Sequence, residues 1–183
     1  MNNRIFAAAC LLAVLPAFAQ EAVQEAPVIE QGKEDMGTLV DALEPKKPVR
    51  TRSIRIARDD VGSPAVAAEP PKVSLLITFE TNSATLTPRS RESLQVVGQA
   101  LASEKLSPFR FAIEGHADPR GNPAANLALS QARARSVRAY LVDTMKIDAA
   151  RLDAVGKGDR ELMNKADPDA PENRRVTIVN LSR

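Results

Sequence analysis

An aspartate, an asparagine and an arginine are spaced in this sequence so that they could bind a ligand carrying both charges. Asp118 lies in the loop 115–121, and Asn126 and Arg133 follow it. A helix of about 3.6 residues per turn brings residues seven apart to within about 20° on one face, so Asn126 and Arg133 would share a side. Arginine binds a carboxylate through two parallel hydrogen bonds, and aspartate accepts from an ammonium group. A zwitterionic ligand is one interpretation, and a salt bridge between Asp118 and Arg133 is the simpler one on spacing alone.

The elements that must position these residues alternate along residues 73–183. Helices are predicted over 88–104 and 122–144, since Thr87-Pro88 and Asn122-Pro123 each combine an N-cap residue with a proline at the first helical position. Strands are predicted where apolar residues alternate, at 73–80, 109–113, 152–155 and 176–181. The order β-α-β-α-β-β predicts an α+β fold, in which a mixed four-stranded sheet carries two main helices on one face.

Residues 1–19 have the layout of a secretory signal peptide. Arg4 precedes an apolar run, and Ala17-Phe18-Ala19 forms a cleavage signal after it. The run is shorter than the roughly 20 apolar residues of a membrane-spanning helix, and no later stretch is long enough. The mature chain is therefore predicted to carry no transmembrane segment. Cleavage would also remove Cys10, the single cysteine.

Residues 20–72 are predicted to be a disordered linker. This stretch is rich in proline, contains no aromatic residue, and has mostly alanine and valine as its apolar residues. Such a composition buries too little apolar surface to offset the chain entropy lost on folding. Two places depart from the pattern. Residues 35–43 could form a short helix, and residues 52–56 alternate like a strand inside a basic run at 50–58.

The composition argues against several classes of function. The 183 residues have a formal net charge of +2 and are 3% aromatic. Grooves that stack bases need aromatic rings, and nucleic-acid binding favours a dense basic face, so no nucleic-acid partner is expected. One cysteine and one histidine cannot build a zinc site of the usual ligands, and no metal or cofactor is expected.

Several ordered motifs resemble one known family. The stretch from Asn126 to Ala134 matches N-x-x-L-S-x-x-R-A, and residues 115–121 resemble G-x-T-D-x-x-G. An F-x-x-N-S-A-x-L segment precedes them at 79–86, and Gly-Lys-Gly and Asn-Arg-Arg-Val follow at 156–158 and 173–176. Together these motifs, over about 75–181, resemble the OmpA-like peptidoglycan-binding domain. Outer-membrane porins, peptidoglycan-associated lipoproteins and flagellar stator proteins share this domain.

The resemblance implies non-catalytic binding of peptidoglycan through the diaminopimelate side chain of its stem peptide. Asp118 would pair with the ammonium group of that side chain, and Arg133 with its carboxylate. The protein would anchor or organise the Gram-negative cell envelope from the periplasm, in association with the outer membrane or the wall. A further envelope protein as partner is compatible with this role.

Further positions of the ligand site follow from the same resemblance. Asn126 would support the loop or touch the ligand, Leu129 would line the pocket, and one of Arg174 or Arg175 would flank it. Two features depart from the family pattern: Ala117 replaces the usual threonine before the aspartate, and the loop 158–173 is short and unlike the usual sequence.

Two alternatives from other functional classes remain at the level of sequence. A cell-wall hydrolase could use His116 and Ser130, which would need to lie within hydrogen-bond reach of each other. His116 is, however, interpreted as a surface loop residue, and Ser130 falls inside the helix motif. The second alternative is a periplasmic protein-interaction module. A non-enzymatic function is expected.

Overall fold

The computed structural model describes residues 27–45, 69–80 and 82–182. The predicted signal peptide 1–19 and the predicted strand at 52–56 lie outside the described residues. So do residues 20–26 and 46–68 of the predicted linker.

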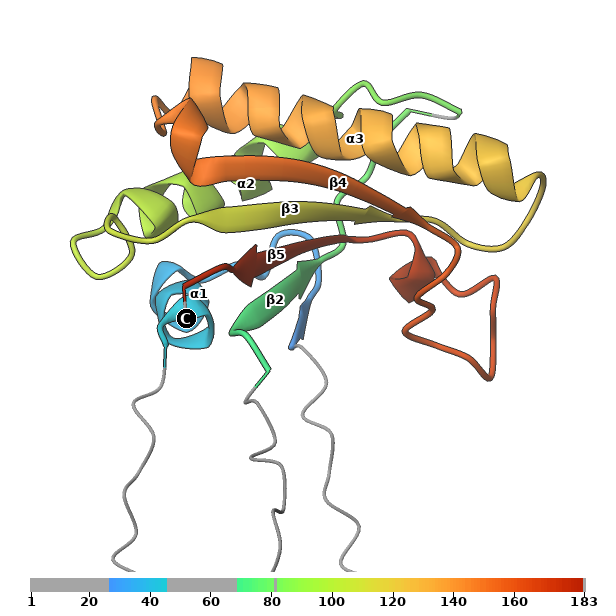
Figure 1. The fold of residues 1–183 in the computed structure, drawn as a ribbon, viewed down its shortest axis with the longest axis horizontal. Coiled ribbons are helices and arrows are strands. Elements are labelled where there is room, and N and C mark those ends of the chain that lie inside the picture. Colours follow the sequence, from blue (N-terminus) through green and yellow to red (C-terminus); the bar gives the residue numbers. More distant parts are fainter. Residues whose placement is uncertain (1–26, 46–68, 81, 183) are drawn as a thin grey trace, which may run out of the picture.

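One mixed sheet runs through the domain in the strand order β1-β2-β5-β3-β4 (Figure 1). Its central strand β5 is antiparallel to both neighbours, whereas the outer pairs β1–β2 and β3–β4 are parallel. The strands are β1 Val28–Ile29, β2 Lys72–Leu75, β3 Phe111–His116, β4 Leu152–Gly158 and β5 Val176–Asn180. The predicted α+β fold is confirmed, and the two-residue strand β1 is added to the four strands that were expected.

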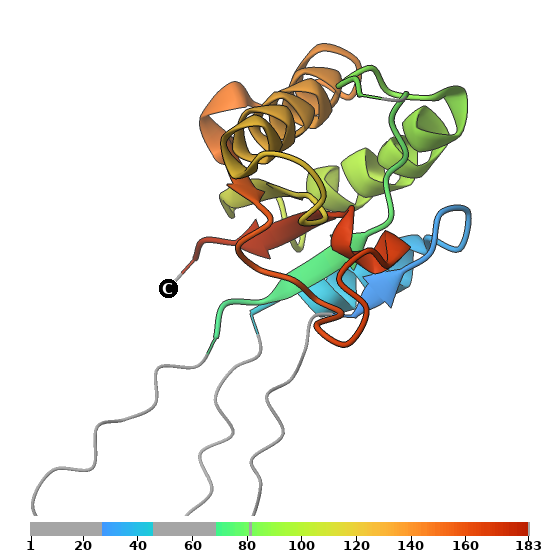
Figure 2. The ribbon, with the colours of Figure 1, turned by 90° about the vertical axis from the view of Figure 1, so that its right-hand side faces the viewer.

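Three helices accompany the sheet, and α2 lies between the other two (Figure 2). They are α1 Met36–Leu43, α2 Pro88–Ala102 and α3 Pro123–Asp143. The predicted starts of α2 and α3 are confirmed, because Thr87 and Asn122 accept hydrogen bonds from the backbone N–H groups of Ser90 and Ala124. Over the described ranges, no helix combines the length and the apolar character needed to cross a membrane.

Residues 27–45 depart from the predicted disordered linker, because they are folded onto the domain. Strand β1 pairs with β2, and Leu39 and Leu43 of α1 have no exposed surface. The amide of Asn180 on β5 donates to the carbonyl of Leu43 at 2.8 Å. The apolar side of α1 is short, and it is buried only against elements far away in the sequence. Local composition therefore predicted disorder where long-range packing gives order.

Helix α3 lies close to β3 and β4 because glycines leave room for it. A Cβ atom at Gly115 would overlap the carbonyl of Ser130, and one at Gly156 would lie 2.6 Å from the backbone nitrogen of Gln131. At this close range the Gln131 side chain accepts from the Gly156 N–H at 2.8 Å, and Ser130 Oγ accepts from the Gly158 N–H at 2.9 Å. These bonds hold the N-terminal half of α3 at the end of the sheet where the loop that follows β3 begins. This loop, within residues 115–121, is called the motif loop below.

Candidate functional site

A cleft opens where β2 and β5 separate. Strand β2 ends at Leu75, opposite Val176, and is shorter than the predicted strand 73–80. Beyond this pair, residues 76–79 line a cleft of about 290 Å³ together with Pro171 and the adjacent residues 174–175. Its lining includes three arginines, Arg133, Arg174 and Arg175.

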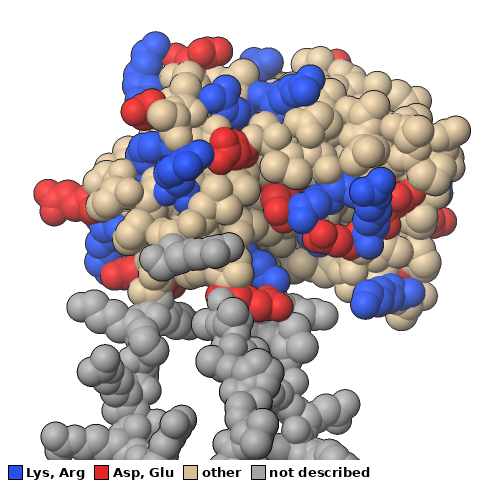
Figure 3. All heavy atoms as spheres, in the orientation of Figure 1, with Lys and Arg blue, Asp and Glu red and all other residues tan. Residues whose placement is uncertain are grey.

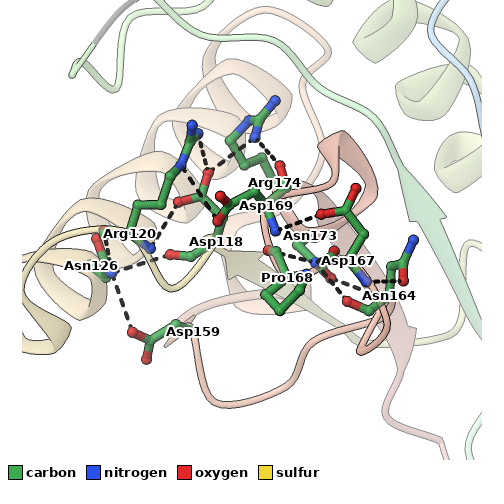
Figure 4. A network of polar contacts seen from close by, with 10 residues as sticks. All are labelled: Asp118, Arg120, Asn126, Asp159, Asn164, Asp167, Pro168, Asp169, Asn173 and Arg174. Carbon is green, nitrogen blue, oxygen red and sulfur yellow. Dashed lines mark hydrogen bonds and ion pairs between the residues drawn. The ribbon is translucent and has the colours of Figure 1, made fainter.

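Asp118 lies beside this cleft and accepts hydrogen bonds from two arginines (Figure 4). Its Oδ2 accepts from Arg120 Nη2 at 2.6 Å and from Arg174 Nη1 at 3.0 Å, and its Oδ1 accepts from the Arg120 N–H at 3.2 Å. The hydrogen bond from the Arg120 side chain is the main reason that the pKa of Asp118 lies below its ordinary value. Asp118 is therefore a stable anion at neutral pH, and its partners are two guanidinium groups and one backbone N–H.

Arg133 approaches the cleft from α3 and is held from two directions. Its Nε donates to the carbonyl of Ser83 at 3.1 Å, and its guanidinium carbon lies 4.9 Å from the centre of the Phe79 ring. Burial lowers the pKa of Arg133, whereas the charge of Asp118 raises it. Within residues 27–45, 69–80 and 82–182, its two terminal nitrogens make no hydrogen bond.

The simple salt bridge between Asp118 and Arg133 does not form. Both oxygens of the Asp118 carboxylate are instead engaged by Arg120, and Oδ2 also by Arg174. Among the described residues, the terminal nitrogens of Arg133 have no hydrogen-bond partner, and the nearby Asp118 carboxylate is held by Arg120 and Arg174.

Asn126 holds the motif loop rather than the cleft. Its Nδ2 donates to the backbone carbonyls of Asp118 and Arg120 at 3.2 and 3.0 Å, and to Asp159 Oδ2 at 3.2 Å (Figure 4). Of the two roles expected for Asn126, this geometry fits support of the loop. Leu129 is partly buried, and neither residue is among those lining the cleft.

The two adjacent arginines have different surroundings. Arg174 joins Asp118 and donates to the backbone carbonyl of Asp169 at 3.0 Å. Arg175 is 8% exposed, donates to the carbonyl of Glu161 at 3.2 Å, and has its pKa lowered by burial. Arg174 is therefore the arginine that reaches the charged mouth of the site, and Arg175 lies deeper.

The loop before Arg174 is organised by Asn173, the first residue of the Asn-Arg-Arg-Val motif, for which the motif alone predicted no role. Asn173 is fully buried, and its Oδ1 accepts from the backbone N–H groups of Met163 and Asn164 at 2.8 and 3.0 Å. Its Nδ2 donates to three backbone carbonyls of the same loop, the nearest at 2.9 Å on Pro168 (Figure 4). In the sequence, only its position next to Arg174 indicated that Asn173 could belong to the site.

His116 is buried at the end of β3, so its interpretation as a surface loop residue is wrong. It is 3% exposed, and burial is the main cause that lowers its pKa to about 3. Ser130 Oγ donates to the carbonyl of Leu127 at 2.9 Å and accepts from the Gly158 N–H. Neither ring nitrogen of His116 has a hydrogen-bond partner among the described residues. The Ser130–His116 pair that a hydrolase would need is therefore not assembled.

Three groups below the cleft could in principle hold a metal ion. The ligand atoms of Glu114, His116 and Glu161 lie within 4.8 Å of one another. The ammonium group of Lys157 lies 3.2 Å from Glu114 Oε1 and 3.0 Å from Glu161 Oε1. Lys157 thus supplies a positive charge between the two carboxylates, and the buried Arg175 adds another beside them. The cluster is balanced by the protein's own cations.

The surface around the site carries both signs of charge. On the face shown in Figure 3, basic and acidic side chains of the described residues are interspersed. The described residues on this face therefore form no single broad basic surface.

The fold and the cleft together define a small α+β domain whose cleft is lined by three arginines. Residues 78–175 match the model of the OmpA family, which is more than half of the chain, and the protein belongs to that family.

Individual relatives agree with this assignment. The chain is 35% identical over 116 residues to outer membrane protein A of Yersinia pseudotuberculosis, covering 58% of this chain and 33% of that protein. It is 35% identical over 102 residues to the peptidoglycan-associated lipoprotein of Pseudomonas aeruginosa, covering 55% and 58%. Among solved structures, the cell wall anchor of the T6SS from Pseudomonas aeruginosa matches with a TM-score of 0.52 and 27% identity, covering 64% of this chain and 85% of that one. The chain spans less than two thirds of the length of these two curated relatives.

Proposed function

We propose that this protein binds peptidoglycan without catalysing a reaction on it. The observation that carries the proposal is the proximity of an anionic and a cationic group at one cleft. Asp118 lies beside the cleft and is held by Arg120 and Arg174, and Arg133 lines the cleft with terminal nitrogens that make no hydrogen bond to the described residues. The relatives named as a peptidoglycan-associated lipoprotein and as a cell wall anchor support the same ligand.

The ligand group that fits this pair is the side chain of diaminopimelate in the stem peptide. Its ammonium group would contact Asp118, and its carboxylate would meet the fork of Arg133, with Arg174 at the flank. Because Asp118 is already ion-paired, the incoming ammonium must exchange with one guanidinium. Arg120 is the group that leaves, since its side chain is 60% exposed, whereas that of Arg174 is 37% exposed and also bonded to the Asp169 carbonyl.

The proposed location is the periplasm, in contact with the wall or the outer membrane. This part of the proposal rests on the signal-peptide prediction for residues 1–19 and on relatives named as outer membrane proteins. A wall-binding domain there would anchor or organise the envelope.

Co-sedimentation with purified sacculi tests the proposal. Wild-type protein should pellet with diaminopimelate-containing sacculi and release no soluble fragments. Asp118→Ala should weaken binding roughly 10- to 100-fold, since a hydrogen bond to a charged group is worth about 1.5–3 kcal/mol. Asp153→Ala is the matched control, because Asp153 is half exposed and pairs with Arg110 rather than with cleft residues. Equal binding by folded Asp118→Ala would refute the site, and release of soluble fragments would refute the non-enzymatic function.

A further inference from the structure

The N-terminal segment 27–45 lies outside the part of the chain that matches the family, yet one of its residues lines the cleft. It is joined to the domain by backbone hydrogen bonds, since Ser74 N–H donates to the Pro27 carbonyl at 3.0 Å and Leu76 N–H donates to the Ile29 carbonyl at 3.2 Å. Gln31 follows directly on this pairing and is one of the residues lining the cleft.

Gln31 is fixed through both its backbone and its side chain. Arg89 Nη2 donates to its backbone carbonyl at 2.9 Å. Its Nε2 donates to Ser90 Oγ at 3.0 Å, and its Oε1 accepts from Thr78 Oγ1 at 3.2 Å. Ser90 is fully buried and donates in turn to the backbone carbonyl of Thr78. The side chain of Gln31 therefore bridges the start of α2 and the cleft segment at Thr78.

This bridge leads directly to the residue proposed to bind the carboxylate. Thr78 is followed by Phe79, and the Phe79 ring lies under the guanidinium group of Arg133. A shift of the Thr78 backbone would move that ring and change the orientation of the Arg133 fork, whose angle decides whether two parallel hydrogen bonds can form.

We propose that Gln31 is a positioning residue of the ligand site, acting on Arg133 through Thr78 and Phe79. The binding unit of this protein is therefore the family domain together with residues 27–45. This inference rests on the proposed function, and it adds that selectivity for the side-chain carboxylate depends on a residue outside the family match.

Isothermal titration of the full chain with two stem peptides tests the inference. One peptide carries diaminopimelate and the other carries lysine, which lacks the side-chain carboxylate that Arg133 would bind. Gln31→Met keeps the length of the side chain and removes both hydrogen bonds. Its affinity for the diaminopimelate peptide should fall about 2- to 10-fold, as expected for loss of neutral hydrogen bonds, with a smaller fall for the lysine peptide.

Two further variants separate positioning from general damage. Lys33→Ala changes a side chain of the same segment that is 72% exposed and that, within the part of the chain that the structure describes, pairs only with Glu30, so its affinities should equal those of the wild type. Gln31→Glu keeps an acceptor for Thr78 but adds a negative charge near the ligand carboxylate. It should lower the affinity for the diaminopimelate peptide more than Gln31→Met does. Thermal melting should show that both variants are folded.

The outcomes distinguish this inference from the proposed function. Unchanged affinity in Gln31→Met and Gln31→Glu, or an equal loss for both peptides, would overturn the positioning role while leaving peptidoglycan binding in place. Absence of binding by the wild-type protein to either peptide would overturn the proposed function, and the inference with it. A reduced preference for diaminopimelate in both folded variants, with Lys33→Ala unchanged, would support it.

Discussion

Two regions meet at the cleft by different physical routes. The loop and helix at 115–133 bring Asp118 and Arg133 together through short-range structure, namely the end of a strand, a seven-residue loop and a capped helix. The segment 27–45 brings Gln31 to the same cleft through long-range structure, since β1 pairs with a strand more than 40 residues away in the sequence.

The difference lies in what fixes each region. The capping bond of Asn122 and the bonds from Asn126 to the Asp118 and Arg120 carbonyls are local, so the loop and the start of α3 are shaped largely by their own sequence. Arg174 and Ser83 add contacts to Asp118 and Arg133 from elsewhere in the chain. The N-terminal region is shaped by Leu39 and Leu43, which have no exposed surface because α2, β2 and β5 cover them. The motif region carries the charges, and the N-terminal region determines how one wall of their cleft is held.

The largest expected effect tests whether the N-terminal region is truly part of the core. Leu43→Ala removes a fully buried side chain, and such truncations cost about 2–5 kcal/mol of unfolding free energy. Met36→Ala, on the same helix but 43% exposed, should cost little. Urea unfolding of both full-length variants measures the difference. Equal stability of the two variants would mean that α1 contributes little to the core. The N-terminal region would then differ from the motif region in being loosely attached, and not in how it is folded.

The sequence predicted the part of the fold that local signals encode. Thr87-Pro88 and Asn122-Pro123 predict the starts of two helices, and alternating apolar residues predict four strands. These elements could therefore be placed without long-range information. The fifth strand could not, because Val28 and Ile29 acquire their role only through pairing with Ser74 and Leu75. The apolar spacing of 35–43 was visible, but composition alone did not indicate what would cover it.

The candidate site divides in the same way. The motifs predicted that Asp118 and Arg133 serve one ligand site, and this stays a prediction. Arg133 lines the cleft, and Asp118 is joined to a second lining residue, Arg174. The partners of these residues were missed, because Arg120 pairs with Asp118 through a loop conformation and Phe79 lies under Arg133 only in the folded chain. His116 was misplaced because strand β3 continues to His116 and buries it, whereas the sequence suggested that the loop begins at Gly115.

A smaller effect is expected from a change within the motif region that keeps its charge. Arg133→Lys retains a cation but loses the planar fork, so affinity for a diaminopimelate peptide should fall roughly tenfold at any ionic strength. Affinity for the lysine peptide should change little. Arg135→Lys, an exposed position on the same helix, is the control. Full retention of affinity by Arg133→Lys would show that a positive charge alone is sufficient for binding. Orientation of the Arg133 guanidinium by the N-terminal region would then have no effect on affinity.

The smallest expected effect is a gain of affinity, and it concerns the cation that must leave Asp118. Arg120→Ala removes a largely exposed guanidinium whose hydrogen bond is the main cause of the lowered pKa of Asp118. Two results should follow: the pKa of Asp118 should rise toward its ordinary value, and a diaminopimelate peptide should bind slightly more tightly, because its ammonium group would no longer have to displace Arg120 from Asp118. A pH titration of the Asp118 carboxyl by NMR measures the first result, and calorimetry measures the second. Arg110→Ala, which removes a comparably exposed arginine paired with Asp153, should change neither. Weaker binding by Arg120→Ala would mean that Arg120 stays in place and contacts the ligand, so that the motif region would bind by adding a partner to Asp118 and not by exchanging one.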